Sequence, residues 1–270
     1  MKRVLVFDSG VGGLSVFDSI QASGAALDLY YAADNAWLPY GLKSEAALCE
    51  RVPLLLTRLA AQWAPDLVVI ACNTASTIVL EQARAALSVP VVGVVPPIKP
   101  AAAHTRTGVI GLLATPATAS SAYVDRLISE FAVDKQVVRF GSSALVAAAE
   151  AKMRGAPASE ITAAVDEAID GLFGAAGGDH IDVVALACTH FPLLGAELAA
   201  VAPRECTWLD SGAAIARRVA ALTAAPLGTS RACAAGFTAA SALPYSALRA
   251  RGFSSLAGIA SAPDFSLFDI

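Results

Sequence analysis

The sequence predicts an α/β fold of two similar domains, each a mainly parallel sheet flanked by helices. Short β-branched runs alternate with alanine-rich stretches of helical pattern. The runs are apolar throughout, which is typical of strands buried on both faces in a parallel sheet. One strand-and-turn pattern also occurs twice, which indicates two related halves. We therefore expect the domains to be related by pseudo-two-fold symmetry, with the functional site between them.

The individual strands and helices can be assigned from these patterns. The expected buried strands are Arg3–Phe7, Leu27–Ala32, Leu67–Ala71, Val91–Val94, Val109–Leu113, Val137–Phe140 and Val183–Ala187. The expected helices are Ser44–Gln62, Thr74–Leu87, Ala117–Phe131 and Ser159–Phe173. Ala232–Thr238 is a candidate for one more strand.

The repeated pattern is an aspartate, five apolar residues and a cysteine. It runs from Asp66 to Cys72 and again from Asp182 to Cys188. The proline-rich stretch Val95–Pro100 is a natural crossover between the halves, and a second crossover near residues 203–207 would return the chain to the first half. The expected first domain is therefore discontinuous, with residues 1–97 plus 207–270, and the second domain is 98–206.

Composition excludes several classes of protein. The 270 residues carry 19 Lys and Arg against 23 Asp and Glu, so no basic surface for nucleic acid is expected. The mean hydropathy of +0.60 comes largely from alanine, and no stretch reads as a membrane-spanning helix. No secretory segment precedes Asp8. These features predict a cytoplasmic protein that binds neither nucleic acid nor membrane.

The five cysteines do not form a disulfide pattern, because their number is odd and their spacing wide. In a reducing compartment they are expected to be free thiols. Cys49, Cys206 and Cys233 lie outside the repeated motif and are interpreted as structural. Cys72 and Cys188 both end a predicted strand, where ligands of open α/β sheets bind.

Polar residues follow the predicted strands at the same edge. Asp8 and Ser9 open a glycine-rich turn before a helix, where exposed N–H groups suit an anion such as a carboxylate. The turn is neither a dinucleotide-binding fingerprint nor a P-loop. Asn73 and Thr74 follow Cys72, and Thr189 and His190 follow Cys188.

Two equivalent thiols suggest a specific chemistry. One thiolate removes a proton from carbon while the opposite thiol returns a proton to the other face, which inverts a stereocentre without redox change. Each thiol then needs a partner for its proton, and Asp8 and His190 are the candidates. A nucleophilic pair of Cys188 and His190 is an alternative, although it leaves Cys72 unexplained.

Cofactor chemistry is not expected. The chain has three histidines and no CxxC motif, which is too few ligands for a zinc site. Its five lysines lie outside the polar strand ends, where a pyridoxal phosphate enzyme would need one. Weaker candidates for substrate contact are Tyr40 and Gly41 in a loop, and Thr115 and Thr118 at the end of a strand.

Four ordered motifs resemble those of the glutamate racemases in the aspartate/glutamate racemase superfamily. The motifs are Asp8–Val16, Pro39–Gly41, Ala71–Ala75 and Ala187–Leu194, and the similarity extends to about residue 240. The resemblance implies that Cys72 and Cys188 are the acid/base thiols. It further implies substrate contacts or orientation by the residues Asp8, Ser9, Tyr40, Gly41, Asn73, Thr74, Thr189 and His190, and in a matching segment by Thr115 and Thr118.

Glu150 aligns with a family glutamate that pairs with the histidine beside the second thiol, although Gly141–Val146 departs from the family's Cys-Pro-x-Leu-Val pattern. The resemblance implies a cofactor-independent homodimer that supplies D-glutamate for peptidoglycan in the bacterial cytoplasm. Alternatives are a racemase of another acid such as aspartate, a decarboxylase with one active thiol, and an amino-acid-binding protein without turnover.

Overall fold

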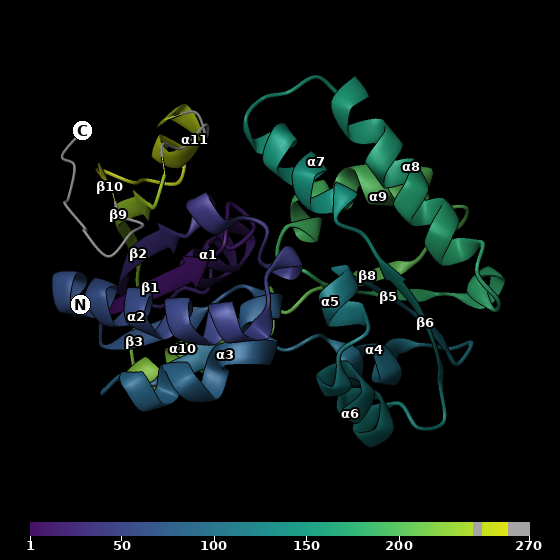
Figure 1. Ribbon diagram of the computed structural model, residues 1–270, viewed down its shortest axis with the longest axis horizontal. Coiled ribbons are helices and arrows are strands. Elements are labelled where there is room, and N and C mark those ends of the chain that lie inside the picture. The colour runs from purple at the N-terminus through teal and green to yellow at the C-terminus, as the bar shows by residue number, and fades with distance from the viewer. Residues whose placement is uncertain (240–244, 259–270) are drawn as a thin grey trace. The chain divides into compact units, whose positions relative to one another are not determined.

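The computed structural model describes residues 1–239 and 245–258, which form two compact α/β units (Figure 1). Unit 1 is Met1–Val94 with Gly212–Ile270, and unit 2 is Val95–Ser211. Both contain parallel sheets flanked by helices, which confirms the predicted fold class. The division differs from the predicted boundaries at residue 207, because Thr207–Leu209 forms a strand that pairs with the sheet of unit 2.

Unit 1 contains a six-stranded parallel sheet among its described residues, in the order β10-β9-β2-β1-β3-β4. Its strands are β1 (Lys2–Asp8), β2 (Leu27–Ala33), β3 (Leu67–Ile70), β4 (Val91–Gly93), β9 (Arg231–Phe237) and β10 (Ser255–Gly258). Its helices are α1 (Leu14–Gln21), α2 (Glu45–Trp63), α3 (Asn73–Ala86), α10 (Gly212–Thr223) and α11 (Tyr245–Arg249), with short 3-10 turns η1 (Asn35–Trp37) and η2 (Tyr40–Leu42).

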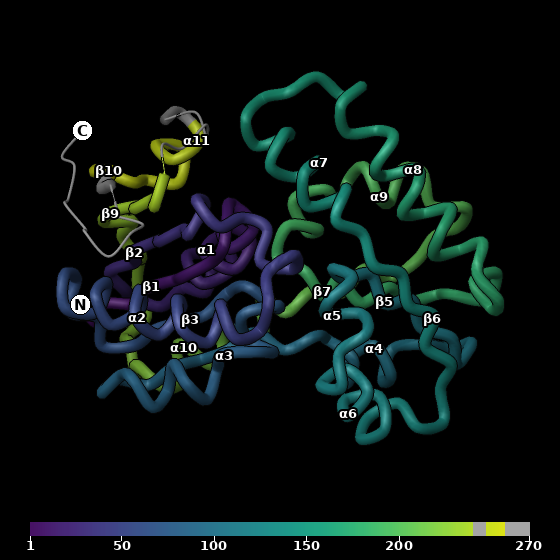
Figure 2. Tube along the Cα trace, in the orientation of Figure 1, coloured from purple at the N-terminus to yellow at the C-terminus, as the bar shows by residue number. Residues whose placement is uncertain are grey.

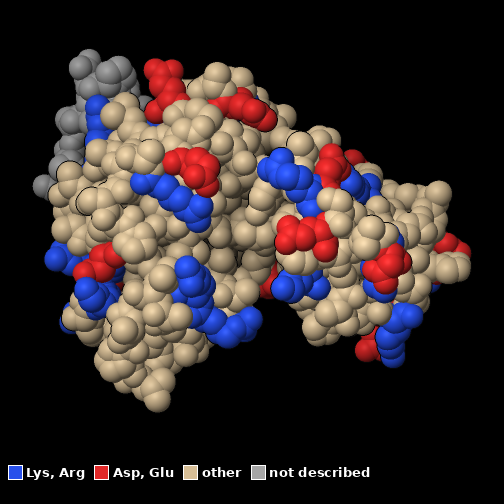
Figure 3. All heavy atoms as spheres, turned by 90° about the horizontal axis from the view of Figure 1, so that it is seen from below, with Lys and Arg blue, Asp and Glu red and all other residues tan. Residues whose placement is uncertain are grey.

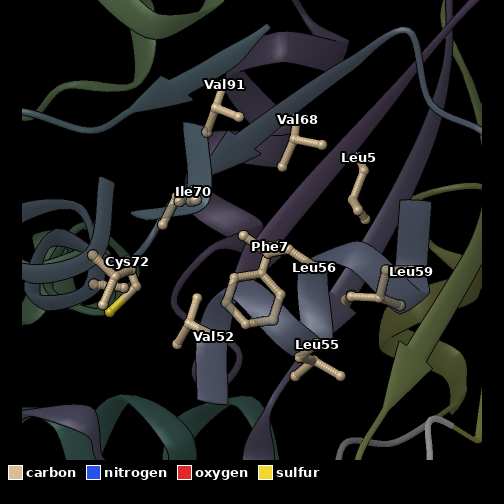
Figure 4. Close-up of a cluster of buried hydrophobic side chains, with 14 of the residues drawn as sticks. Leu5, Phe7, Val52, Leu55, Leu56, Leu59, Val68, Ile70, Cys72 and Val91 are labelled. Atoms are coloured by element: carbon tan, nitrogen blue, oxygen red, sulfur yellow. The ribbon is translucent and has the colours of Figure 1, made fainter. Parts of the chain in front are cut away.

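The helices of unit 1 cover both faces of its sheet. On one face, α2 and α3 pack side by side over alternate strand residues such as Leu5, Phe7 and Ile70 (Figures 2 and 4). Successive residues of a strand point to opposite faces, and Val6 is also fully buried. Helices α1 and α10 pack against each other, and α1 also contacts β2. Cys72 lies at one end of the buried cluster (Figure 4).

Unit 2 contains a four-stranded parallel sheet in the order β6-β5-β7-β8 among the residues described. Its strands are β5 (Val109–Ala114), β6 (Gln136–Gly141), β7 (Val183–Ala187) and β8 (Thr207–Leu209). Its helices are α4 (Ile98–His104), α5 (Pro116–Ala119), α6 (Ala122–Phe131), α7 (Ala144–Met153), α8 (Ser159–Phe173) and α9 (Gly195–Val201), with 3-10 turns η3 (Gly178–His180) and η4 (Phe191–Leu194).

The two units share one strand order. Four strands of unit 1 run β2-β1-β3-β4, and the sheet of unit 2 runs β6-β5-β7-β8. The register also matches, because Val4 is opposite Leu67 in unit 1 and Ile110 is opposite Val183 in unit 2. These pairs occupy equivalent places in the sequence repeat, so the repeat corresponds to a shared parallel α/β topology.

The repeated aspartate anchors the start of each central strand pair. In unit 1, Asp66 Oδ2 accepts a hydrogen bond of 2.8 Å from the Arg3 N–H, and hydrogen bonds from Lys2 and Arg3 lower the pKa of Asp66. In unit 2, Asp182 Oδ2 accepts 2.7 Å from the Arg106 N–H and its Oδ1 accepts 2.6 Å from the Thr105 hydroxyl. Each carboxylate therefore ties the segment entering one strand to the start of the next.

The observed elements differ from the prediction in a few places. The seven predicted strands and the candidate at 232–238 are present, but β8 and β10 were not predicted. The predicted helix Ala117–Phe131 is divided into α5 and α6. The division occurs because the Ser121 hydroxyl accepts from the Val124 N–H and donates to the Thr118 carbonyl, which starts a new helix.

The described helices are each too short or too polar to span a bilayer. On the face shown in Figure 3, basic and acidic side chains are interspersed within a largely uncharged surface.

Gly171 allows α8 to approach β6 closely, and we expect Gly171→Ala to destabilise the protein. A Cβ at this position would lie 2.0 Å from a ring carbon of Phe140. The overpacking costs about 1–3 kcal/mol, which outweighs the gain of about 1 kcal/mol in helix propensity. Thermal and urea unfolding should therefore show a lower stability.

The matched control is Ala163→Gly at an exposed position of the same helix, which should cost about 1 kcal/mol through propensity alone. A Gly171→Ala variant as stable as the parent, or more stable, would contradict the packing argument.

Candidate active site

Cys72 joins β3 to α3 and is the N-cap residue of that helix. Its side chain is buried, and its carbonyl accepts a hydrogen bond of 2.8 Å from the Ser76 N–H in the first turn. The helix N-terminus carries partial positive charge, which stabilises a thiolate at this position. The sequence pattern therefore places the thiol as expected, at the carboxyl edge of the unit 1 sheet.

Asp8 and Ser9 lie beside Cys72 at the end of β1. The Ser9 hydroxyl oxygen is 3.8 Å from the Cys72 sulfur and 3.4 Å from Asp8 Oδ1. Asp8 Oδ1 also accepts 2.9 Å from the Gly10 N–H, so the turn is held by the carboxylate itself. A Cβ on Gly13 would lie 2.6 Å from the Asp8 Cβ, and glycine is therefore needed for this close approach.

Asn73 and Thr74 follow Cys72 in the first turn of α3, and both side chains are buried. The Asn73 Oδ1 atom accepts no hydrogen bond from the residues that the structure describes. A buried acceptor without a partner is costly. This atom is therefore suited to a donor group on a ligand.

Tyr40 and Gly41 form the start of η2, next to Cys72 in the same unit. The Tyr40 ring is almost fully buried in the cluster that contains Cys72. Burial, the neighbouring charge of Asp34 and the proximity of Cys72 raise the pKa of Tyr40 well above its usual value. Tyr40 therefore remains a neutral hydroxyl at working pH.

Sequence reasoning missed Asp34, which binds the Tyr40 hydroxyl, and it missed Arg51 and Thr238, which both bind Asp34. The Tyr40 hydroxyl donates a hydrogen bond of 2.7 Å to Asp34 Oδ2. Asp34 follows β2 directly, so the strand-end rule that identified Asp8 could also have identified it. Arg51 lies within α2 and Thr238 after β9, and their roles depend on long-range contacts.

Cys188 follows β7 in unit 2 and is buried. Its surroundings differ from those of Cys72, because a turn and the 3-10 helix η4 follow it and α9 begins only at Gly195. The repeat therefore reproduces the strand end but not the long helix that follows. The Cys188 sulfur lies 3.9 Å from His190 Nδ1. The polar neighbour of Cys188 is therefore a histidine side chain, whereas Cys72 lies at the N-terminus of a long helix.

His190 is oriented by Glu150, which extends from α7. The distance from His190 Nε2 to Glu150 Oε1 is 2.9 Å, and the histidine is buried. The second ring nitrogen therefore faces the Cys188 sulfur. The segment before Glu150 departs from the family pattern, yet Ser142 Oγ still accepts 3.1 Å from the Leu145 N–H at the start of α7.

Lys152 joins the same helix to the turn after Cys188. Its ammonium donates 2.8 Å to the Leu193 carbonyl and lies 2.7 Å from Glu197 Oε1. Helix α7 therefore contacts the segment of His190 at two points, through Glu150 and through Lys152. Sequence reasoning did not single out Lys152.

Thr115, Thr118 and Thr189 complete the polar edge of unit 2. Thr115 caps α5, where its hydroxyl accepts 3.3 Å from the Thr118 N–H and donates 3.1 Å to the Thr118 hydroxyl. Ala114 is opposite Ala187 in the sheet. Thr115 and Cys188 are therefore the first residues after two neighbouring strands, at the same edge of the sheet. Thr189 is buried beside Cys188 in the chain.

The candidate residues thus fall into two groups, each at the carboxyl edge of its own sheet. Unit 1 brings together Asp8, Ser9, Tyr40, Gly41, Cys72, Asn73 and Thr74, and unit 2 brings together Thr115, Thr118, Glu150, Cys188, Thr189 and His190. Across residues 1–239 and 245–258, no group of three or more His, Cys, Asp or Glu side chains could hold a metal ion.

Solved structures share this architecture. A crystal structure of Escherichia coli glutamate racemase, in complex with L-glutamate and the activator UDP-MurNAc-ala, matches 97% of this chain and 99% of its own. Its TM-score is 0.88 and its sequence identity is 43%. Glutamate racemase RacE1 from Bacillus anthracis matches with a TM-score of 0.80 at 25% identity, over 98% of this chain and 99% of its own.

Sequence comparisons agree with these structural matches. The glutamate racemase of Sphingopyxis alaskensis is 52% identical over 220 residues, which cover 82% of this chain and 81% of that protein. The glutamate racemase of Vibrio cholerae is 49% identical over 80% of this chain and 79% of its own. The Asp/Glu/Hydantoin racemase family model matches residues 9–219. The resemblance seen in the motifs is thereby confirmed, and the chain belongs to the Asp/Glu/hydantoin racemase family and is an amino-acid racemase.

Proposed function

We propose that this racemase interconverts L-glutamate and D-glutamate, with Cys72 and Cys188 as the two bases. The observation that carries the proposal is that buried thiols end equivalent strands, β3 and β7, of two sheets with the same strand order. Each thiol has its own polar partners nearby. The relatives and structures described above are glutamate racemases, which favours glutamate over another acid.

The proposed reaction has two proton transfers at Cα. One cysteine thiolate takes the Cα proton, so that a C–H bond breaks, an S–H bond forms and the electron pair passes towards the α-carboxylate. The other cysteine thiol gives its proton to the opposite face of Cα. The S–H bond breaks, the new C–H bond forms, and no electrons are gained or lost overall.

The neighbouring side chains support each thiol in turn. Asp8, linked to the Cys72 sulfur through the Ser9 hydroxyl, assists the first thiol. His190, with Glu150 on its other nitrogen, assists the second. Proton transfer by positioned groups of this kind contributes roughly 10²–10⁴-fold to a rate.

Polar groups at the two strand edges are proposed to bind the substrate. Asn73 Oδ1 lacks a donor among the described residues, and the α-ammonium group of glutamate would supply one. Tyr40 and Gly41, at the start of the 3-10 turn η2, are proposed to contact one carboxylate of the substrate. The side chains of Ser9, Thr74, Thr115, Thr118 and Thr189 lie at the same strand edges and are proposed to line the site around the two carboxylates and the charge that develops during proton removal.

The physiological setting is proposed from the same relationships. D-glutamate made by this chain would enter peptidoglycan synthesis in the bacterial cytoplasm, and the enzyme would act as a homodimer. A null strain that grows without added D-glutamate would contradict the first part. Sedimentation equilibrium that gives the mass of one subunit would contradict the second.

Replacement of either thiol tests the two-base mechanism. We expect Cys72→Ser and Cys188→Ser each to lower racemisation by about 10²-fold or more, because a hydroxyl is a poor base at neutral pH. The parent enzyme in heavy water should abolish the optical rotation of L-glutamate and introduce deuterium at Cα.

Cys233→Ser is the matched control, because this half-buried cysteine lies outside both groups and should retain activity. Full turnover by either single-thiol variant would rule out two bases. Release of carbon dioxide in place of deuterium incorporation would indicate a decarboxylase.

Isotope effects distinguish the partners of the two thiols. Each thiol removes the Cα proton from one enantiomer. If a variant slows this step, the deuterium isotope effect on turnover of that enantiomer should become larger than in the parent enzyme. For the other enantiomer the same thiol only returns a proton, so its isotope effect should shrink. We therefore expect Asp8→Asn and His190→Asn to raise the isotope effect on kcat/KM for opposite enantiomers.

Each kcat/KM should also fall by roughly 10–10³-fold in these two variants. The measurement compares kcat/KM for protiated and Cα-deuterated L- and D-glutamate. Isotope effects that change in the same direction in both variants would refute the assignment of one partner to each thiol.

A further inference from the structure

Asp34 lies directly after β2 in unit 1 and is fully buried. Its two oxygens accept four hydrogen bonds. Arg51 Nη2 and the Thr238 hydroxyl each donate a hydrogen bond of 2.7 Å to Oδ1. Arg51 Nε donates a hydrogen bond of 2.6 Å to Oδ2, and the Tyr40 hydroxyl donates one of 2.7 Å to the same oxygen. A carboxylate has about four acceptor sites, so Asp34 is saturated by its protein neighbours.

These contacts fix the direction of the Tyr40 hydroxyl proton. Because the proton is donated to Asp34, the hydroxyl oxygen presents only lone pairs to its remaining neighbours. Tyr40 and Cys72 belong to one packed cluster, and the charge of Cys72 contributes to the raised pKa of Tyr40. The orientation of this hydroxyl is therefore part of the environment of the first thiol.

The main chain of Asp34 contacts Asp8, the residue proposed to assist Cys72. Its N–H donates 2.9 Å to the Asp8 carbonyl at the end of β1. Asp34 therefore holds Tyr40 through its side chain and Asp8 through its backbone. The centroid of the Trp37 ring lies 4.4 Å from the central carbon of the Arg51 guanidinium, and this cation–π contact further restrains the arginine.

Buried ion pairs contribute little net stability, because desolvation offsets their attraction. An ion pair that is retained in the core and saturated with hydrogen bonds can instead specify one local arrangement. We propose that Asp34 and Arg51 are positioning residues for the Cys72 end of the active site, and that they act through the Tyr40 hydroxyl and the Asp8 main chain. The inference rests on the proposed two-thiol function.

The test is Asp34→Asn in the full-length enzyme. An asparagine amide presents one acceptor oxygen with two lone pairs in place of two oxygens with about four, and it sets an N–H₂ group against a donor of Arg51 and against the hydroxyl of either Tyr40 or Thr238. Small displacements at a catalytic centre can cost roughly 10²-fold, so kcat/KM should fall by about 10–10²-fold. The isotope effect should rise for the same enantiomer as in Asp8→Asn and shrink for the other.

Asp28→Asn is the matched control. Asp28 lies near the opposite end of the same strand, β2, and also pairs with an arginine, Arg231, at 2.7 Å. Its replacement should leave kcat/KM and both isotope effects near the parent values. If Asp34→Asn does not fold, as judged by circular dichroism and melting temperature, Arg51→Lys replaces it. That variant keeps the charge but loses the two-pronged contact.

The outcomes separate the two proposals. An Asp34→Asn or Arg51→Lys variant with isotope effects shifted as in Asp8→Asn supports the positioning role. A loss of activity with unchanged isotope effects, or a shift as in His190→Asn, overturns it and leaves the two-thiol function intact. If Asp8→Asn and His190→Asn fail to differ from each other, the assignment of one partner to each thiol is overturned together with this inference, and the two-thiol mechanism is still judged by the Cys72→Ser and Cys188→Ser variants.

Discussion

The parallel pairing of neighbouring central strands is the constraint on which both groups of site residues depend. Parallel strands end at the same edge of a sheet, so residues that follow paired strands become neighbours. Ser9 meets Cys72 in this way after β1 and β3, and Thr115 and Cys188 leave β5 and β7 together. A shift of one residue would turn every side chain to the opposite face and separate these groups.

The carboxylates at the start of the strands stabilise this register through hydrogen bonds to the neighbouring segment. Asp66 and Asp182 lie at the amino edge of their sheets, at the opposite end of the strand from Cys72 and Cys188. In the repeat, each aspartate precedes its cysteine by six residues. Each accepts main-chain hydrogen bonds from the segment that enters the adjacent strand. One repeated motif therefore combines an anchor at one edge of the sheet with a reactive group at the other.

Much of this arrangement could be predicted from sequence, because apolar runs and strand-end polar residues are local signals. The strand positions, the two thiols and their candidate partners Asp8 and His190 came from such signals. The strand β8 could not, because Thr207–Leu209 is partly exposed and lacks the run of β-branched residues that marks the equally short β4. Arg51 could not either, because an arginine in an amphipathic helix is ordinarily solvated, and its contact with Asp34 depends on the packing of α2. The division of the helix at Ser121 depended on a capping bond that competes with helix propensity.

The two thiols have unlike surroundings: Cys72 is the N-cap of a long helix, whereas Cys188 precedes a short turn and lies near a histidine that contacts a glutamate. For a racemase this asymmetry is limited by thermodynamics. Enantiomers have equal free energy, so the Haldane relationship requires kcat/KM to be the same in both directions whatever residues perform the two steps. Divergence of the two halves can alter the common value of kcat/KM and how kcat and KM are divided for each enantiomer, but not the ratio of kcat/KM between the two enantiomers. The unequal surroundings therefore set how long each enantiomer occupies the enzyme, and leave the position of equilibrium untouched.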